Sequence, residues 1–212
     1  PANAQKFGCE VFQIFSRPPQ GGKAPELTPA IVGKFKQERK KYGYTECTIH
    51  TPYFINFGSA NPRIYHGSIA VIRQELERAS LLEIPYVITH VGSYRDLGQD
   101  KGYQQVVAGL EKVFAGYKGS AQLLLENSAG SGEVIGDVFE ELAAIVDARK
   151  LKKYSIGVCL DTAHAFASGY DLRTVKAVTG TFKKLDSVIG LERLKAIHAN
   201  DSKFEFESRR DR

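Results

Sequence analysis

Short apolar runs alternate with longer amphipathic stretches along this chain. The runs are rich in β-branched residues and leucine, which is typical of buried strands, and they predict strands at 9–15, 47–50, 86–89, 121–125, 156–160 and 194–197. Between them, apolar residues recur at helical spacing, which predicts helices at 26–41, 68–82, 103–114, 139–149 and 175–189. Residues 2–7 resemble the end of a further helix. Thr28 before Pro29 should cap the first full helix, and Ser68 is a candidate cap for the second.

Six strands that alternate with helices predict parallel strands joined by right-handed crossovers. No glycine-rich dinucleotide fingerprint follows any of these strands, which counts against a nucleotide-binding sheet. Five successive strands end at a histidine or a carboxylate, and such ends converge on one mouth only in a closed barrel. We therefore expect an α/β fold, a (β/α)8 TIM barrel that here lacks the first and last strands. The chain, 1–212, should form a single (β/α) barrel domain, a fragment truncated at both ends.

The composition limits the class of protein. With 42% hydrophobic and 25% charged residues, it is ordinary for a soluble globular chain. It contains no run of about 18 apolar residues and opens with no signal segment, so we expect a cytoplasmic protein without membrane contact. Three cysteines lack metal-binding spacing, and Cys9 and Cys159 lie in or beside apolar runs, which indicates reduced core thiols. A net charge of +5 permits a polyanionic partner but is weak evidence for one.

Candidate chemistry gathers at the ends of the predicted strands. Five successive strands end at residues that can bind a metal: His50, His90, Glu126, Asp161 and His198. Glu126 follows three leucines, and a carboxylate in that setting must be paired, solvated or metal-bound. A lone histidine at a strand end is more often structural, but five coincident strand ends favour a functional site. Imidazoles mixed with carboxylates fit zinc, with manganese or iron as alternatives.

Further polar residues lie close to these positions in the sequence. His164 follows the fifth strand by three residues of a turn rich in alanine and is another candidate ligand. Asn127, Asn200 and Asp201 come directly after candidate ligands, where they either orient them or simply form turns. His66 has no such setting and is expected at the surface. A site of this kind can hold more than one ion, and two ions about 4 Å apart can clamp a phosphodiester.

Three segments closely resemble the signature segments of the endonuclease IV family, the zinc-dependent apurinic/apyrimidinic endonucleases of base excision repair. They are Leu-Glu-Asn-Ser-Ala-Gly-Ser-Gly at 125–132, the segment that begins Gly-Val-Cys-Leu-Asp-Thr-Ala-His at 157–174, and His-Ala-Asn-Asp-Ser-Lys at 198–203. The resemblance covers nearly the whole chain. It implies a (β/α)8 barrel with three zinc ions at its mouth. It also implies hydrolysis of the phosphodiester 5′ to an abasic site in double-stranded DNA, by a monomer, leaving a 3′-hydroxyl.

The same resemblance implies a set of metal ligands. One zinc would be held by His50, His90 and Glu126. Glu126 would also bridge to a second zinc and position the attacking hydroxide, which makes it the catalytic residue. Asp161 and His198 would also bind the second zinc. His164 and Asp211 would bind the third.

DNA contacts are implied in two loops. Tyr53 and Phe54 match the pair of side chains that the family inserts into DNA, with phenylalanine in place of the more usual leucine. The alternative is that both residues simply pack within their loop. Gln20 stands where the family has a probing arginine, so the contribution of the loop at 16–22 is altered.

Two other functions are compatible with part of this pattern. A metal-dependent sugar isomerase or epimerase on the related barrel also carries histidines and carboxylates at its strand ends. It does not predict the pairing of Asp161 with His164, an exposed wedge at Tyr53, or Asp211 near a third metal. A protein that binds damaged DNA without cleaving it is the other alternative.

Overall fold

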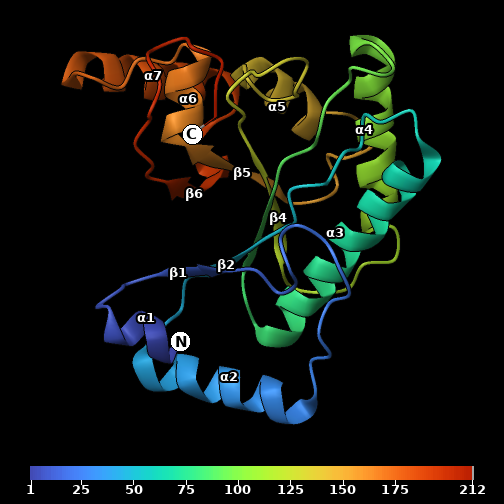
Figure 1. The fold of residues 1–212 in the computed structure, drawn as a ribbon, viewed down its shortest axis with the longest axis vertical. Helices are drawn as coiled ribbons and strands as arrows, with labels where there is room; N and C mark the ends of the chain where they lie inside the picture. The colour runs from blue at the N-terminus through green and yellow to red at the C-terminus, as the bar shows by residue number, and fades with distance from the viewer. Residues whose placement is uncertain (212) are drawn as a thin grey trace.

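Every strand of the sheet pairs in parallel with the strand that precedes it in the sequence. The computed structural model describes residues 1–211, and within them the strands are β1 (Phe12–Ile14), β2 (Cys47–His50), β3 (Tyr86–Thr89), β4 (Gln122–Glu126), β5 (Ile156–Asp161) and β6 (Leu194–His198). Figure 1 shows the sheet curling, with the helices outside it and an open side between β1 and β6. The expected α/β barrel that lacks two strands is confirmed.

Helices cover the outer face of this sheet, except for a short one that continues the fifth strand at its carboxyl end. They are α1 (Ala2–Lys6), α2 (Pro29–Tyr42), α3 (Pro62–Leu82), α4 (Gln99–Phe114), α5 (Phe139–Val146), α6 (Thr162–Ser168) and α7 (Val175–Val188), and the 3₁₀ turn η1 (Leu191–Arg193) precedes β6. Helix α2 is capped as predicted, although it begins at Pro29 and not at residue 26. The Thr28 side chain accepts a hydrogen bond from the Ile31 amide at 3.4 Å, and Pro29 takes the first position.

The predicted start of α3 is wrong. This helix begins at Pro62 because Asn61 caps it, accepting a hydrogen bond from the Arg63 amide at 2.9 Å. Ser68 is therefore not a cap. It is buried within the helix, where its hydroxyl donates to the Ile64 carbonyl at 2.9 Å. A polar residue with a partner inside a helix resembles a cap when only the sequence is considered.

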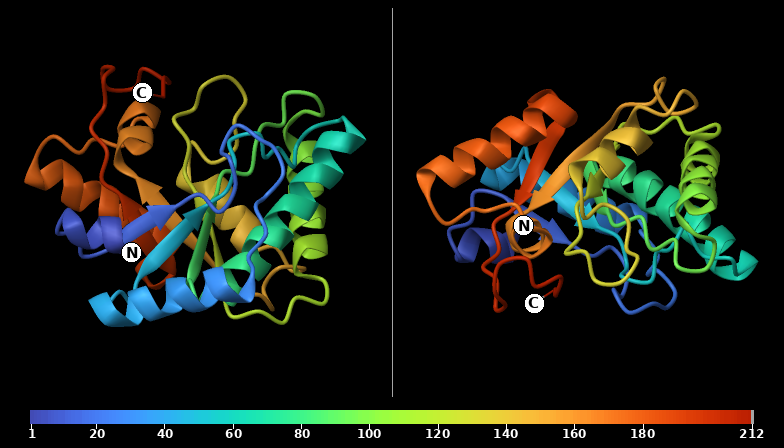
Figure 2. Two further views of the ribbon diagram at one scale, coloured as in Figure 1. Left: turned by 60° about the horizontal axis from the view of Figure 1, so that its bottom comes forward. Right: turned by 90° about the horizontal axis from the view of Figure 1, so that it is seen from above.

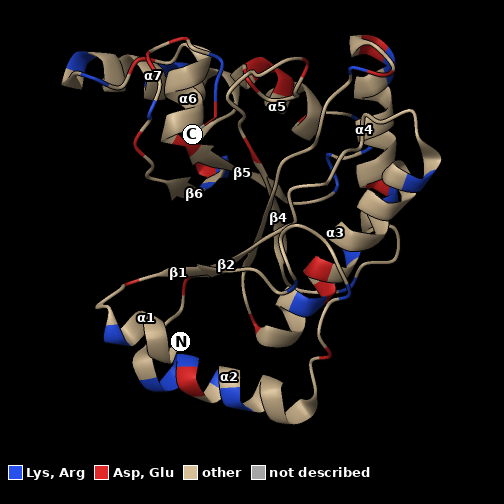
Figure 3. Cartoon of the chain, in the orientation of Figure 1, with Lys and Arg blue, Asp and Glu red and all other residues tan. Residues whose placement is uncertain are grey.

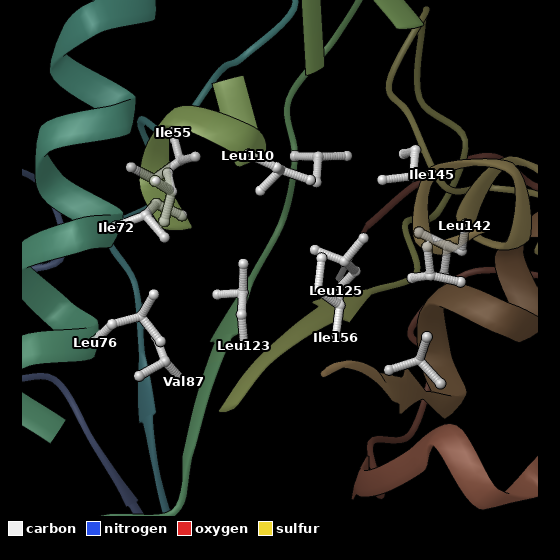
Figure 4. Packing of buried hydrophobic residues seen from close by; sticks show 14 of the residues in the cluster. Ile55, Ile72, Leu76, Val87, Leu110, Leu123, Leu125, Leu142, Ile145 and Ile156 are labelled. Atoms are coloured by element: carbon white, nitrogen blue, oxygen red, sulfur yellow. The ribbon is translucent and has the colours of Figure 1, made fainter. Parts of the chain in front are cut away.

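The main hydrophobic core lies between the outer face of the sheet and the helices. Leu76 of α3, Leu123 of β4 and Leu142 of α5 are almost completely buried in it. Figure 4 shows Leu76 next to Val87, and Leu125 next to Ile156. Full burial of one such side chain contributes about 1.5–3 kcal/mol. The core thus fixes the strands, and with them the residues at their ends.

The inner face of the sheet carries a smaller apolar cluster of Ile88, Leu124 and Cys159. Side chains alternate between the two faces of a strand, so Leu124 shares this face with Glu126, and Cys159 shares it with Asp161. The strand-end residues therefore lie directly above the inner cluster. Figure 2 (left) shows that the loops after β1 and β4 and the C-terminal segment lie at this same edge of the sheet.

The cysteine prediction is only partly correct. Cys47 and Cys159 are buried, whereas Cys9 is exposed because β1 begins only at residue 12; all three are free thiols. His66 is exposed, as expected. In the part of the chain that the structure describes, no helix combines the length and apolar character needed to cross a membrane.

Candidate metal centre

Glu126 lies at the centre of a group of imidazoles at the carboxyl ends of the strands. Its side chain is only 2% exposed. One carboxylate oxygen, Oε2, lies 2.9 Å from His50 Nε2 and 3.2 Å from His90 Nε2. The other, Oε1, lies 2.7 Å from His198 Nδ1. The structure thus brings together four of the residues that the strand-end pattern singled out, and His50, His90 and Glu126 are called the first donor group below.

Asp161 extends this cluster because the strand that it ends runs directly into a helix. Its Oδ1 accepts a hydrogen bond from the His164 amide at 2.9 Å and so caps α6, which replaces the turn that was predicted there. Asp161 oxygens lie 3.8 Å from His164 Nδ1 and 3.8 Å from His198 Nδ1. His164 Nε2 in turn lies 3.2 Å from Asp211 Oδ1. The donors beyond Glu126 therefore form one continuous set.

Three of the histidines contact an uncharged oxygen atom through one ring nitrogen and face a carboxylate at close range with the other, which is Glu126 for His50 and His198 and Asp211 for His164. His50 Nδ1 lies 2.7 Å from the Thr51 carbonyl, and His164 Nδ1 lies 3.0 Å from the Asn127 carbonyl. His198 Nε2 lies 2.9 Å from the Gln13 side-chain oxygen. An oxygen acceptor requires an N–H on that nitrogen, so a neutral ring turns its lone pair toward a carboxylate.

Two acceptors that face each other repel unless a proton or a cation lies between them. A carbonyl or amide oxygen on the outer nitrogen of a histidine is also the usual second shell of a metal ligand. Donor atoms bound to one zinc at about 2.0–2.1 Å lie about 3.3 Å apart at the corners of a tetrahedron. The distances of 2.9 and 3.2 Å in the first donor group are close to this value. These residues fit a divalent ion with nitrogen and oxygen ligands.

Charge is distributed around Glu126 in a way that favours its ionised form. Burial raises the pKa of Glu126, but hydrogen bonds with His198 and His50, which form when a proton lies on the facing ring nitrogen, outweigh burial and hold this pKa well below its usual range; a cation between the same atoms would act in the same direction. Burial lowers the pKa of His90. Burial, with the negative charge of Glu126 next, raises the pKa of the Cys159 thiol far above its usual range. Cys159 is therefore a neutral side chain beneath a carboxylate that stays charged.

Two asparagines, for which the sequence left orientation and turn formation equally open, hold the candidate ligand Asp161 through their side chains. The Asn127 side chain accepts a hydrogen bond from the Asp161 amide at 2.6 Å and donates to the Asp161 carbonyl at 3.1 Å. Asn200 Nδ2 donates to Asp161 Oδ2 at 2.6 Å. Asp201 only accepts a hydrogen bond from the following amide, of Ser202, which is a turn contact. The sequence gives no signal for Gln13, whose role becomes visible only when β1 and β2 are paired and Gln13 lies beside Thr48.

The metal centre opens into a cleft of about 980 Å³. Tyr53 and Phe54 line this cleft and are 65% and 43% exposed, and the Tyr53 ring packs edge-on against Phe15. Gln20 is exposed on the loop after β1 and does not line the cleft. Two of the three candidate DNA-binding residues therefore lie next to the metal centre, and the third lies beyond the rim of the cleft.

Comparison with known proteins agrees with this geometry. The sequence model of the xylose isomerase-like TIM barrel family matches residues 1–212. A protein named probable endonuclease 4 from Methanoculleus marisnigri is 42% identical over 207 residues, which cover 97% of this chain and 73% of the relative. The protein of the same name from Cenarchaeum symbiosum is 39% identical over 213 residues, with coverages of 99% and 75%. The chain belongs to the endonuclease IV family.

Solved structures agree with membership of the endonuclease IV family. The crystal structure of endonuclease IV from Thermus thermophilus superposes with a TM-score of 0.87 at 36% identity, covering all of this chain and 74% of that one. A D-tagatose 3-epimerase-like protein superposes with a TM-score of 0.71 at 22% identity, covering 94% and 70%. The second similarity extends only to the fold. The comparisons therefore favour the endonuclease over the sugar epimerase.

Proposed function

We propose that this protein is a metal-dependent DNA-repair endonuclease that hydrolyses the phosphodiester 5′ to an abasic site in double-stranded DNA and leaves a 3′-hydroxyl. The observation that carries the proposal is a buried Glu126 side chain between three imidazoles, in a chain of the endonuclease IV family. A buried carboxylate destabilises the fold unless it is paired or bound to a metal. The setting of Glu126 therefore indicates a metal-binding or catalytic role.

Zinc is the metal that this donor set suits best, with Mn²⁺ or Fe²⁺ as alternatives, and we propose three ions per complete protein. The first would be held by the first donor group. The second and third would divide the remaining donors, which are Asp161, His164, His198 and Asp211, with Glu126 bridging. When bound, such ions supply Lewis acidity toward a phosphate oxygen and lower the pKa of a bound water.

The side chains of this chain contribute the rest. Glu126, whose pKa is held low, remains an acceptor and can orient the proton of the attacking water near the phosphorus. The oxygen partners of His50 and His164 keep these rings in one tautomer, so their free nitrogens face the cleft throughout the reaction. Tyr53 and Phe54 are exposed beside the centre and can stack on bases next to a missing one.

The partner that we propose is double-stranded DNA that contains an abasic site. Figure 3 shows Lys and Arg spread over several helices and mixed with acidic residues, without one continuous basic band. General attraction to phosphates, from a net charge of +5, therefore adds little specificity. The apolar wedge at Tyr53 and the shape of the cleft would select the lesion, and Gln20 would contribute a polar contact from the neighbouring loop.

We also propose a monomer with a single (β/α) barrel domain, located in the cytoplasm. One main core contains residues from all six strands and from α2 to α7, which supports the single domain. Three free thiols support a reducing compartment.

The direct test is incision of a DNA duplex that carries one tetrahydrofuran abasic analogue, by the purified protein loaded with zinc. We expect a cut 5′ to the analogue and a 3′ end that a DNA polymerase extends. A duplex without the analogue is the control. Intact abasic DNA together with epimerisation of D-tagatose would replace this proposal with the sugar-epimerase alternative.

A variant links this activity to the centre. Glu126→Ala should lower the rate of incision by at least about a hundredfold, since loss of a ligand costs at least as much as loss of the residue that orients it. Binding of abasic DNA, measured by fluorescence anisotropy, should be largely kept because the rim of the cleft is unchanged. Near-normal turnover by this variant would rule out Glu126 as the catalytic residue.

A further inference from the structure

A second cluster of buried charges lies outside the metal centre, between the loop after β1 and helix α3. Glu75 is completely buried, and Arg17 and Arg78 are 7% and 8% exposed. Glu75 accepts hydrogen bonds from Arg17 Nε and from the Ser16 hydroxyl. Arg78 donates to the Ser16 hydroxyl at 2.6 Å and to the Ser16 carbonyl at 2.7 Å. Two residues of the loop are thus held by two residues of the helix.

Apolar side chains in place of this charged cluster would stabilise the contact between the loop and α3 at least as well. A buried ion pair loses most of its attraction to the cost of desolvation, and replacing it by well-packed apolar residues is often neutral or stabilising. Buried hydrogen-bonded charges do fix one geometry, because any displacement leaves a charge without a partner. The cluster therefore serves to hold the loop in one conformation.

The same cluster holds the far end of the loop. Arg78 Nη1 donates to the Pro25 carbonyl at 2.8 Å, so a single side chain contacts residues 16 and 25. Between these two points the chain turns back on itself, with a hydrogen bond of 3.1 Å from the Gly21 amide to the Pro18 carbonyl. Gln20 lies on this exposed turn. The loop 16–25 is called the anchored loop below.

The anchored loop also supports the aromatic pair at the cleft. The Tyr53 amide donates to the Pro19 carbonyl at 3.1 Å. A Cβ atom built at Gly21 would lie 3.5 Å from the Phe54 ring, so the loop backbone is in contact with that ring. Glu75 thus connects through the anchored loop to both residues of the wedge, although it does not line the cleft itself.

We propose that Glu75 is a positioning residue for DNA binding, which holds the anchored loop, and through it Tyr53 and Phe54, in the conformation that meets DNA. This proposal rests on the proposed function. Its physical basis is that a loop ordered before binding loses little conformational freedom when the complex forms. The residue acts on the side of the site that receives DNA and makes no contact with the metal ligands.

The test compares Glu75→Gln with Glu77→Gln in the zinc-loaded protein. Glu77 lies on the same helix two residues later, but it is exposed and pairs only with Arg73 one turn away. We expect Glu75→Gln to raise KM for the abasic duplex about tenfold, with kcat within about twofold of the unchanged protein. Hydrolysis of bis(4-nitrophenyl) phosphate, which needs no wedge, should stay the same. Glu77→Gln should change none of these values.

A second readout does not depend on activity. Trypsin should cut after Lys23 in the anchored loop several times faster in Glu75→Gln than in Glu77→Gln, because the loop is released. If Glu75→Gln does not fold, Ser16→Ala replaces it, since this variant removes the hydroxyl that bonds both Glu75 and Arg78 and keeps all the charges. Equal KM and equal trypsin cleavage in the test and control variants would overturn the proposal. So would a parallel loss of DNA and small-diester hydrolysis.

The two proposals fail in different ways. A protein that incises no abasic DNA in its unchanged form contradicts the proposed function, whereas the comparison of trypsin cleavage still decides whether Glu75 holds the loop. Normal incision with no difference between the Glu75 and Glu77 variants contradicts only the positioning role.

Discussion

Asp161 illustrates how one side chain can serve both the fold and the site. Its Oδ1 caps α6, while its Oδ2 faces the imidazole of His198. These two contacts alone do not fix the orientation of the carboxylate. Asn127 fixes its backbone and Asn200 fixes the oxygen that faces the cleft. The orientation of this candidate ligand therefore depends on neighbours that are not themselves in the proposed ligand set.

Asn200→Ala should lower zinc affinity by about 10- to 100-fold, the usual cost of losing an orienting partner. The backbone of residue 200 keeps its hydrogen bonds with Thr162, so the local fold should persist. Competition with a chromogenic chelator measures the affinity. Asp201→Ala is the control, because that side chain makes only a turn contact. Equal affinities in the two variants would contradict an orienting role for Asn200.

The sequence identifies a functional residue when the residues next to it in the chain make it unusual. Glu126 was recognisable because a charge directly after three leucines is unusual, and His50 because it ends a β-branched run. Gln13, Arg17 and Glu75 carry no such signal. The contacts that give them their roles, between Gln13 and His198 and between Arg17 and Glu75, span 185 and 58 residues of the chain, and a polar residue beside an apolar run is ordinary. Only the three-dimensional arrangement identifies them.

At the scale of elements, a glycine in helix α4 allows this helix to pack closely against its neighbours. A Cβ atom at Gly109 would lie 2.5 Å from the ring of Phe57 and 3.2 Å from that of Tyr65. Phe57 is completely buried and has no room to move. The glycine weakens the helix by its conformational freedom but allows the loop after β2 and α3 to pack closely on it.

Gly109→Ala should lower the free energy of unfolding by about 1–3 kcal/mol, because overpacking outweighs the gain in helix propensity. Gly33→Ala in α2 is the matched control, since nothing lies within 4 Å of the position that its Cβ would take. It should stabilise the protein by about 0.5–1 kcal/mol. Urea unfolding followed by circular dichroism measures both. A Gly109→Ala protein as stable as the control would show that this packing yields without cost.

The periodicity of the sequence located the elements better than it located their ends. Strands β2 and β3 have the predicted bounds because apolar runs and turn residues mark them clearly. Strand β1 is shorter than predicted, since only three of its residues pair with β2. The sequence predicts a turn where the seven residues of α6 form a helix, because this helix depends on a cap, Asp161, that the sequence also marks as a candidate ligand.

At the scale of the whole molecule, the site unites strands that otherwise contact only their neighbours in sequence. A hydrogen bond joins His198 on β6 to Gln13 on β1, across the open side of the sheet and 185 residues apart in the chain. Ions bound by residues of several strands would connect the same parts of the molecule. Their binding should therefore stabilise the fold as a whole.

Removal of metal by a chelator should lower the melting temperature by about 5–10 °C, the shift that about 2.7 kcal/mol of ligand binding gives in a domain of this size. Differential scanning calorimetry with and without EDTA measures it. The Glu126→Ala protein should respond much less, because its donor set is incomplete. Identical melting temperatures of the unchanged protein in both conditions would show that metal contributes nothing to stability.

The pairing of each strand with its predecessor also gives the metal sites an order in time. During synthesis, the first donor group is complete once Glu126 has left the ribosome, and β2, β3 and β4 can pair at that point without any later segment. His198 follows at ordinary rates of translation roughly 4 to 14 seconds later. A nascent chain is therefore able to acquire its first ion before the remaining ligands exist.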